Sequence, residues 1–324
     1  MSIWQTASWQ NMLIASWQSE EYFIIEQNVA TSSLRDDTVE MNHGEDIQKI
    51  YVEKRSVSLW EYGLFVIGFK GELDEDTMDS LQELCAEEKC LFLQIETIDY
   101  FMQPLSLEKG ENSREGWVNK YYKKFIPPYT ALIDLTQSEE QILAAMKPKG
   151  RYNIKVARKK WVVVEQVDSH IWNITKFYAL MSETTARDSF AGNSLEYYKI
   201  FLESLDNAQM FFAYHDGEII AAGIFVTQGD VMTYYYGASS NHKRNLMAPY
   251  LLQWTAIEHA IKRWCRIYDF LGVAGDNEKN SSLAWVTDFK MKLSPQKTLV
   301  SESRLYINKK WKYMLISLLR KLKK

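Results

Sequence analysis

The chain has 324 residues, of which 46% are hydrophobic, and a formal net charge of −4. This length favours two domains, and only 14 Gly and 6 Pro argue against collagen-like or disordered chains. The cysteines Cys85, Cys90 and Cys265 have no CxxC spacing, which argues against disulfides and zinc. With neither a signal-peptide pattern nor an apolar stretch long enough to span a bilayer, a cytoplasmic protein is expected.

The first half of the chain predicts a hairpin, a helix and a buried strand. The alternating runs 50–60 and 62–69 predict two paired strands. Residues 74–89 begin with acidic side chains, as a helix start favours, and predict a helix. The apolar run 91–96 follows at once and predicts a buried strand.

The second half repeats this order after a join at Ile126-Pro127-Pro128, where two prolines interrupt regular structure. Residues 129–135 predict a strand, and 138–147 a helix with Ser138 as its N-cap. The run 210–240 predicts a meander with turns at Asp216-Gly217 and Gly229-Asp230. A helix over 249–264 and a strand over 266–273 follow.

The repeated order of meander, helix and strand indicates two duplicated α/β domains with mixed sheets. Chance similarity among ordinary elements is the alternative.

Basic residues gather in two segments. Residues 147–160 hold seven basic side chains and no acidic one, and Pro148 and Gly150 place some of them at a helix start. They form either a solvated helix face or a site for phosphates. The tail 309–324 also holds seven basic residues, with Trp311 and later apolar residues at helical spacing. It packs its apolar face on the body or lies against anionic lipid, and both can hold if its start is packed and its end faces the membrane.

No GxSxG, HExxH or P-loop pattern is present, and the five histidines have no ligand-like spacing, so no metal site is expected. Asp269, in the last core strand, is either a catalytic acid or a group that orients backbone. Tyr234 and Tyr236 end a strand, and strict alternation predicts that they share one face. Lys290 follows Phe289 in a predicted apolar strand, where a charge is costly unless it is used.

These segments together resemble the FemABX family of peptidoglycan aminoacyltransferases. The resemblance rests on seven motifs in the family's order, covering nearly the whole chain: Thr6–Trp9, the hairpin from Tyr51, residues 127–160, TARDSF at 185–190, YYYGASS at 234–240, YDFLGV at 268–273 and VTDFKMK at 286–292. The chain departs from the family's pattern at FVIGFKGEL (65–73) and LSPQ (293–296) and at Asn11 and Ser194.

The resemblance implies two GNAT-like domains in tandem, without a coiled-coil arm. Domain 1 would cover 1–127, with the C-terminal segment 299–324 packing back on it, and domain 2 would cover 128–298 and carry the acyl-transfer site. The enzyme would move Gly, Ala or Ser from aminoacyl-tRNA to the stem-peptide amine of lipid II or UDP-MurNAc-pentapeptide. It would need no cofactor, and its basic tail would contact the inner leaflet of the plasma membrane.

The resemblance also assigns roles to residues. Lys290, with the backbone at Phe289, would stabilise the oxyanion of acyl transfer. The remaining residues would bind the substrates: Tyr234, Tyr236, Tyr198, Arg187, Lys147, Lys149 and Arg151. An acetyl-CoA-dependent N-acetyltransferase on the same fold is an alternative, disfavoured because GASSNHKRNLMAPY (237–250) lacks a G-x-G run. A non-catalytic RNA- or membrane-binding module is another.

Overall fold

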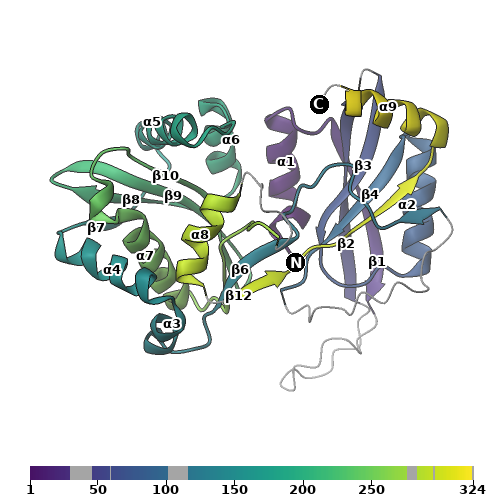
Figure 1. The fold of residues 1–324 in the computed structure, drawn as a ribbon. Coiled ribbons are helices and arrows are strands. Elements are labelled where there is room, and N and C mark those ends of the chain that lie inside the picture. Colours follow the sequence, from purple (N-terminus) through teal and green to yellow (C-terminus); the bar gives the residue numbers. More distant parts are fainter. Residues whose placement is uncertain (30–45, 59, 101–115, 276–282, 295, 323–324) are drawn as a thin grey trace. The chain divides into compact units, whose positions relative to one another are not determined.

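The structure is a computed structural model that describes residues 1–29, 46–58, 60–100, 116–275, 283–294 and 296–322. The chain forms two compact units (Figure 1). Unit 1 comprises Met1–Asp99, Leu105–Ile126 and Ser301–Lys324, and unit 2 comprises Tyr100–Pro104 and Pro127–Val300. Both are mixed sheets covered by helices, so the predicted α/β class is confirmed.

Unit 1 is a six-stranded sheet in the order β1-β2-β3-β4-β13-β5. Its parallel pair is β3–β4, joined by helix α2. The other pairs are antiparallel. The described elements are η1 (Ile3–Gln5), α1 (Ala7–Ala15), β1 (Glu21–Val29), β2 (Asp46–Ser58), β3 (Glu61–Phe69), α2 (Glu75–Glu87), β4 (Phe92–Thr97), β5 (Trp117–Val118), β13 (Ser303–Ile307) and α9 (Lys310–Leu322).

The predicted hairpin, helix and strand of the first half are confirmed as β2–β3, α2 and β4. Asp74 caps α2, accepting the backbone N–H of Thr77 at 2.7 Å, and two acidic residues follow in the first turn, where the helix dipole favours them. Strand β1, which pairs with β2 along its whole length, was not predicted. Strand β13 pairs with β4 and β5, which holds the C-terminal segment in unit 1.

Unit 2 is a seven-stranded sheet in the order β12-β6-β11-β10-β9-β8-β7. Its parallel pair is β10–β11, connected through helix α7. The described elements are β6 (Tyr129–Asp134), α3 (Glu139–Ala145), α4 (Pro148–Lys159), β7 (Val163–Val167), α5 (Ile171–Asp188), α6 (Leu195–Ser204), β8 (Ala208–His215), β9 (Glu218–Gln228), β10 (Val231–Ser239), η3 (Arg244–Leu246), α7 (Ala248–Lys262), β11 (Ile267–Asp269), α8 (Ala284–Leu293) and β12 (Gln296–Leu299).

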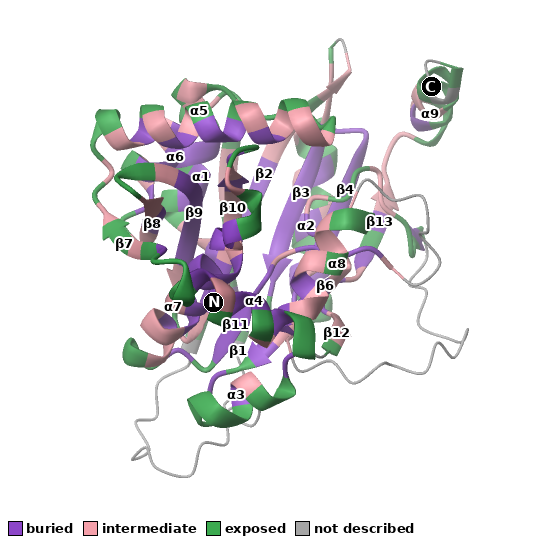
Figure 2. Ribbon diagram, turned by 60° about the vertical axis from the view of Figure 1, so that its left-hand side comes forward, coloured by how far each residue is buried: buried purple, intermediate pink, exposed green. Residues whose placement is uncertain are grey.

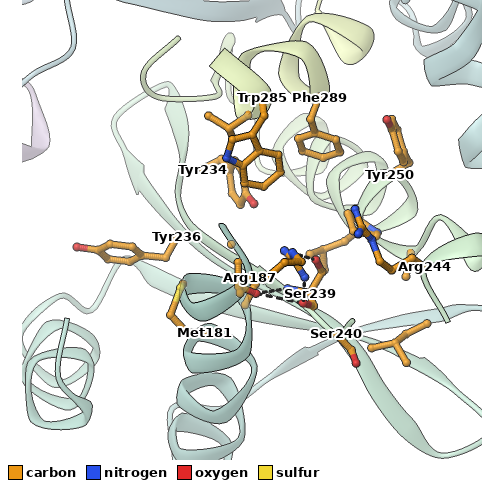
Figure 3. Close-up of a pocket in the computed structure, with 18 of the residues that line it drawn as sticks. Met181, Arg187, Tyr234, Tyr236, Ser239, Ser240, Arg244, Tyr250, Trp285 and Phe289 are labelled. Carbon is orange, nitrogen blue, oxygen red and sulfur yellow. Dashed lines mark hydrogen bonds between the residues drawn. The ribbon is translucent and has the colours of Figure 1, made fainter. Parts of the chain in front are cut away.

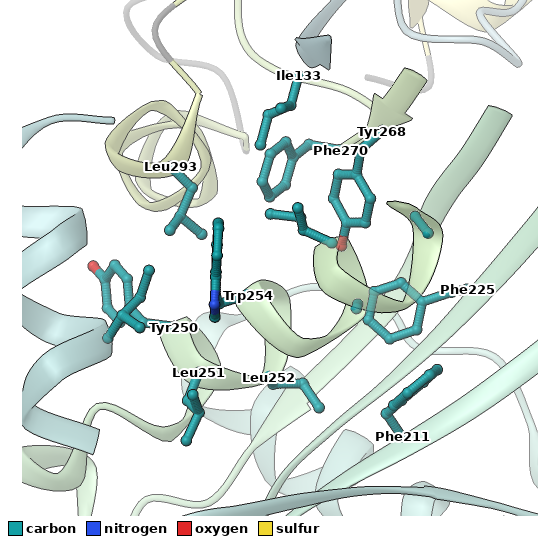
Figure 4. Packing of buried hydrophobic residues seen from close by; sticks show 14 of the residues in the cluster. Ile133, Phe211, Phe225, Tyr250, Leu251, Leu252, Trp254, Tyr268, Phe270 and Leu293 are labelled. Atoms are coloured by element: carbon teal, nitrogen blue, oxygen red, sulfur yellow. The ribbon is translucent and has the colours of Figure 1, made fainter. Parts of the chain in front are cut away.

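Helices cover both faces of the sheet of unit 2, with α5 and α6 on one face and α4 and α7 on the other (Figure 1). Helix α7 is apolar on nearly every side and lies in the core, where Trp254 packs among Leu293, Tyr250 and Leu251 (Figure 4). The predicted meander, helix and strand are confirmed as β8–β10, α7 and β11. Between β7 and β8 the described chain forms only α5 and α6, of 18 and 10 residues, so no long arm is present there.

In each unit the buried residues lie in the central strands of the sheet and on the inner faces of the helices, whereas the outer faces of the helices are exposed (Figure 2). The prediction of a helix start inside the basic cluster is confirmed, because α4 begins at Pro148. Among the described residues, no helix has the length and apolar character needed to cross a membrane.

Candidate active site

A cavity of about 840 Å³ lies in unit 2 beside the end of β10 (Figure 3). Its wall is formed by the second half of β10, the end of α5 with residues 190–193, the residues that lead into α7, and one side of α8. The aromatic rings of Tyr234, Tyr250 and Trp285 face it together with several cations. A concave site with aromatic rings and a few charged groups is the usual form of a small-molecule site.

Lys290 lines this cavity from helix α8, not from a strand. The prediction of a strand over 286–292 is therefore wrong. The buried residues of α8 are Lys290 and Leu293, three positions apart, which is the spacing of one helix face. Phe289 lies in the helix interior, where each N–H donates along the helix, so its backbone is not the oxyanion donor that the resemblance implies. Its ring packs edge-on against Tyr250 at 5.0 Å between centroids.

The ammonium of Lys290 is held by two backbone carbonyls and by one aromatic ring. It donates to the carbonyl oxygens of Leu271 and Gly272, the latter at 2.8 Å. It also lies 5.9 Å from the centroid of the Tyr234 ring. Burial lowers the pKa of Lys290 to about 8, against an opposing attraction from the carboxylate of Asp269. The amine therefore changes its charge within reach of physiological pH.

A turn after β11 aims these carbonyls. Leu271 and Gly272 both adopt positive φ, of 50° and 59°, which is strained for leucine. Asp269 holds the turn, because its carboxylate accepts the N–H of Leu271 at 2.8 Å and the hydroxyls of Thr130 and Tyr100 at 2.5 and 3.2 Å. Of the two roles considered for Asp269, these bonds support the orienting one. Burial raises the pKa of its carboxyl, while these bonds and the cation of Lys290 oppose that rise.

The prediction that Tyr234 and Tyr236 share one face is wrong. A register shift between them, of the kind a β-bulge produces, breaks the alternation of β10. Tyr234 stacks on Phe225 at 5.4 Å, below Lys290, while Tyr236 points towards α6 and meets the hydroxyl of Tyr197 at 2.9 Å. Both line the cavity, and Figure 3 shows their rings pointing in different directions.

A glycine makes room for Tyr234. A Cβ atom at Gly237 would lie 1.5 Å from the Tyr234 hydroxyl, so the tyrosine ring can lie across β10 only because residue 237 has no side chain.

Tyr198 and Arg187 line the cavity but are bound within the protein. Tyr198 is buried and packs edge-on against Phe177 and Tyr236. Arg187 pairs with the carboxylate of Asp188 through two nitrogens, at 2.9 and 2.8 Å, and donates to the carbonyl of Ser239 at 2.9 Å. Its planar fork thus fastens the end of α5 to the end of β10.

The three basic residues predicted to bind phosphate do not line the cavity. Arg151 donates to the carbonyls of Ala144, Leu143 and Met146 and so caps the C-terminus of α3. Lys147 occupies the N-cap position of α4, and Lys149 lies over the ring of Tyr152 at 5.1 Å. These three residues therefore lie outside the cavity that Lys290 lines, although the backbone N–H of Lys147 donates to the carbonyl of Lys292 on α8 at 3.2 Å.

The cations that do line the cavity include Lys243 and Arg244, which were not among the predicted site residues. Arg244 begins the short helix η3, and Figure 3 shows its side chain reaching towards the cavity beside Tyr250. Lys243 has a positive φ of 56° and pairs with Glu218 at 2.7 Å. Trp285 and Tyr250 were also missed. The run His-Lys-Arg ahead of a proline-started helix was the available signal.

Comparison with known proteins identifies the family. The family model "FemAB family" matches residues 114–218 and 203–321, well over half of the chain. The chain belongs to the FemAB family. The resemblance inferred from the seven motifs is thus confirmed. The aminoacyltransferase FemA of Staphylococcus epidermidis is 35% identical over 77 residues, which cover 24% of this chain and 18% of FemA.

A second relative matches over a longer stretch. The lipid II:glycine glycyltransferase of Staphylococcus aureus is 20% identical over 284 residues, covering 63% of this chain and 66% of the relative. The chain thus spans less than two thirds of both curated relatives. Both names describe acyl-transferring enzymes, in line with the predicted enzyme class.

Two solved structures have a fold similar to that of this chain. The crystal structure of FemX has a TM-score of 0.76 at 16% identity, covering 97% of this chain and 94% of FemX. The C-terminal domain of a putative lysylphosphatidylglycerol synthetase from Agrobacterium fabrum has a TM-score of 0.53 at 12% identity, covering 80% and 81% of the two chains. At these identities the likeness concerns the fold alone. The predicted pair of α/β domains with mixed sheets is confirmed.

Proposed function

We propose that this chain is an aminoacyltransferase that moves an amino acid from aminoacyl-tRNA to an amine of a peptidoglycan precursor. Membership of the FemAB family supports the reaction class, and the name of the Staphylococcus aureus relative, lipid II:glycine glycyltransferase, supports the kind of acceptor. The observation that carries the proposal is the buried amine of Lys290 against the ring of Tyr234 in the cavity.

Lys290 would stabilise the oxyanion that forms when the acceptor amine attacks the ester carbonyl of aminoacyl-tRNA. An ammonium has three N–H donors. In the described part of the chain two of them are directed at Leu271 and Gly272, which fixes the nitrogen and leaves a third for the reacting oxygen. A fixed donor in a water-poor site is worth more than one in water, because no reorganisation is needed during the reaction.

The tyrosines would act as neutral hydrogen-bond donors. Burial raises the pKa of Tyr234 and raises that of Tyr236 well above its ordinary value, so neither phenol ionises at neutral pH. Tyr234 would contact the aminoacyl group below Lys290, and Tyr236 would bound the cavity on the side of α6. The tetrahedral intermediate would then break its bond to the 3′ oxygen of the tRNA, and this oxygen would take up the proton that the acceptor amine loses, directly or through water.

Lys243 and Arg244, which line the cavity ahead of α7, would hold the phosphate of the donor. The first turn of α7 is not part of this site, because Pro249 carries no N–H and the N–H of Tyr250 donates to the carbonyl of Met247 at 3.0 Å. We place Arg244 in the role first given to Lys147, Lys149 and Arg151. We further propose that Gly, Ala or Ser is transferred and that the acceptor is the lipid-linked precursor, reached from the cytoplasm.

The test is a transfer assay with a mixture of charged tRNAs, presented with lipid II or with UDP-MurNAc-pentapeptide and read by mass spectrometry. A mass gain of one aminoacyl residue on either precursor supports the proposal. A parallel reaction contains acetyl-CoA in place of tRNA. Acetylation there, with no aminoacyl product in the first reaction, would replace the proposal with the N-acetyltransferase alternative.

A further inference from the structure

Helix α9 contacts the body of unit 1 through the helix face that carries Tyr313 and Arg320. Tyr313 is buried and packs against Phe92 at 5.8 Å and against Tyr122 at 6.3 Å between ring centroids. About two turns later, the guanidinium of Arg320 lies 4.0 Å from the centroid of the Tyr122 ring. These contacts fix the rotation of the helix about its axis.

The opposite side of α9 is apolar and exposed. Its members recur three and four positions apart, which places them in one stripe along the helix. They are Trp311, Met314, Leu315, Leu318, Leu319 and Leu322, each at least half exposed. We call these residues the α9 stripe. Of the two arrangements that the sequence allowed, the helix therefore does not pack its apolar face on the body; it turns it outwards. Figure 2 shows α9 as mostly exposed.

The hairpin β2–β3 adds a further aromatic ring at the start of the helix. Glu61, in the first position of β3, pairs with Lys312 and lies 3.9 Å from Lys309. Trp60 directly precedes it, at a positive φ of 70°, with 91% of its surface exposed. A bulky side chain in the left-handed region is uncommon, and this one is displayed at the turn beside the first turn of α9.

Positive charge surrounds the α9 stripe. Residues 303–324 contain no acidic side chain. Lys120 lies 5.9 Å from the ring centroid of Tyr313, on the body side of the helix. The pKa of Lys123 is lowered by burial and by the neighbouring cations Arg55 and Arg320, which shows that positive charge is crowded here. Lys310 is exposed at the first position of the helix.

We propose that the α9 stripe and Trp60 form a docking surface for an anionic phospholipid bilayer, with the surrounding lysines and arginines at the phosphate level. An exposed apolar stripe edged by Lys and Arg, with Trp among its members, is the composition of a helix that lies in the plane of a membrane interface. Charge complementarity selects this occupant over a second copy of the chain, because two copies would bring two crowded positive rims together.

The docking surface would bring the enzyme to a lipid-linked acceptor. Its biological role therefore rests on the proposed function, but its binding to lipid does not. Binding to a bilayer needs no turnover, and turnover on lipid II dissolved in detergent micelles needs no bilayer. The failure of one is therefore distinguishable from the failure of the other.

The experiment measures binding of the full chain to vesicles of equal parts phosphatidylglycerol and phosphatidylcholine, and to vesicles of phosphatidylcholine alone. The double variant Leu315→Gln/Leu319→Gln removes part of the α9 stripe, and Val163→Gln/Ile171→Gln changes two exposed branched residues of unit 2 as its control. Lys310→Ala removes one cation, and its control is Lys159→Ala, an exposed lysine at the end of α4. Thermal melting confirms that each variant is folded.

Wild type is expected to bind the anionic vesicles and to bind the neutral ones more weakly. The double leucine variant should lose roughly tenfold or more in affinity, and Lys310→Ala should lose about fivefold, while both controls bind as wild type does. Equal loss in a variant and its control, equal binding to both kinds of vesicle, or no binding would overturn the proposal. A dimer in sedimentation that Leu315→Gln/Leu319→Gln dissociates would assign the stripe to a second copy and overturn it as well.

Discussion

Replacing Lys290 with methionine tests the oxyanion role in the proposed reaction. The side chain keeps its length and apolar stem but loses the charge and the three donors. Removing one fixed donor to an oxyanion lowers kcat by roughly 10²–10³. The assay is single-turnover transfer from charged tRNA to lipid II in detergent micelles, with thermal melting to show that the variant is folded.

The pH dependence of kcat/KM in the wild-type enzyme provides a second, independent test of the role of Lys290. Burial lowers the pKa of Lys290 to about 8, so its amine is mostly charged at pH 7 and mostly neutral at pH 9. If the charged form acts, kcat/KM should fall about tenfold between these values. Lys290→Met should lack this alkaline fall. A rate that instead rises through pH 8 would make the neutral amine a general base, and near-normal transfer by Lys290→Met would refute the role altogether.

Three further predictions concern neighbouring groups. Asp269→Asn removes a negative charge that raises the pKa of Lys290, so the alkaline fall in kcat/KM should move to lower pH; an unmoved profile would show that Asp269 is not charged when the enzyme acts. Gly237→Ala forces the ring of Tyr234 to move, which should lower the free energy of unfolding by about 1–3 kcal/mol, measured in urea, and reduce transfer; unchanged values would contradict the packing. Burial raises the pKa of Glu96 in β4 to about 7, so folding favours its protonated form, and the stability this gives is lost as pH rises from about 4.5 through 7. Glu96→Gln should therefore flatten the dependence of the urea midpoint on pH in this range, and a slope equal to that of wild type would count against it.

The regular elements of both units were predictable because each carries a local pattern. Alternating residues marked β2–β3 and β8–β10, and capped, amphipathic or apolar segments marked α2 and α7. Strand β1 was missed because its pairing with β2 is a long-range contact that no local pattern encodes. The family was predictable because seven short motifs kept their order.

The site was predicted in part. Lys290, Phe289, Tyr234, Tyr236, Tyr198 and Arg187 do line one cavity. Apolar and basic residues alternate from Phe289 to Leu293, which favours a strand. The segment was therefore predicted as a strand, although it forms helix α8. The orientation of Tyr236 depends on a bulge, which adds one residue to a strand without a composition signal.

The number of basic residues in a segment did not predict which segment lines the cavity. Seven cations over 147–160 suggested a phosphate site, yet Arg151 is used to cap α3. The shorter run at 242–244 reaches the cavity because η3 and the start of α7 turn it there. Which basic segment faces a ligand is decided by tertiary packing, which composition does not contain.

The most direct test of the central claim, that the charged amine of Lys290 stabilises the tetrahedral oxyanion, is the affinity of a phosphonate analogue of that intermediate. Wild type and Lys290→Met would be compared by competitive inhibition. An interaction made only in the transition state should weaken the analogue by the same factor by which kcat/KM falls. An analogue that binds both proteins equally well, while Lys290→Met is slow, would show that Lys290 acts in some other step.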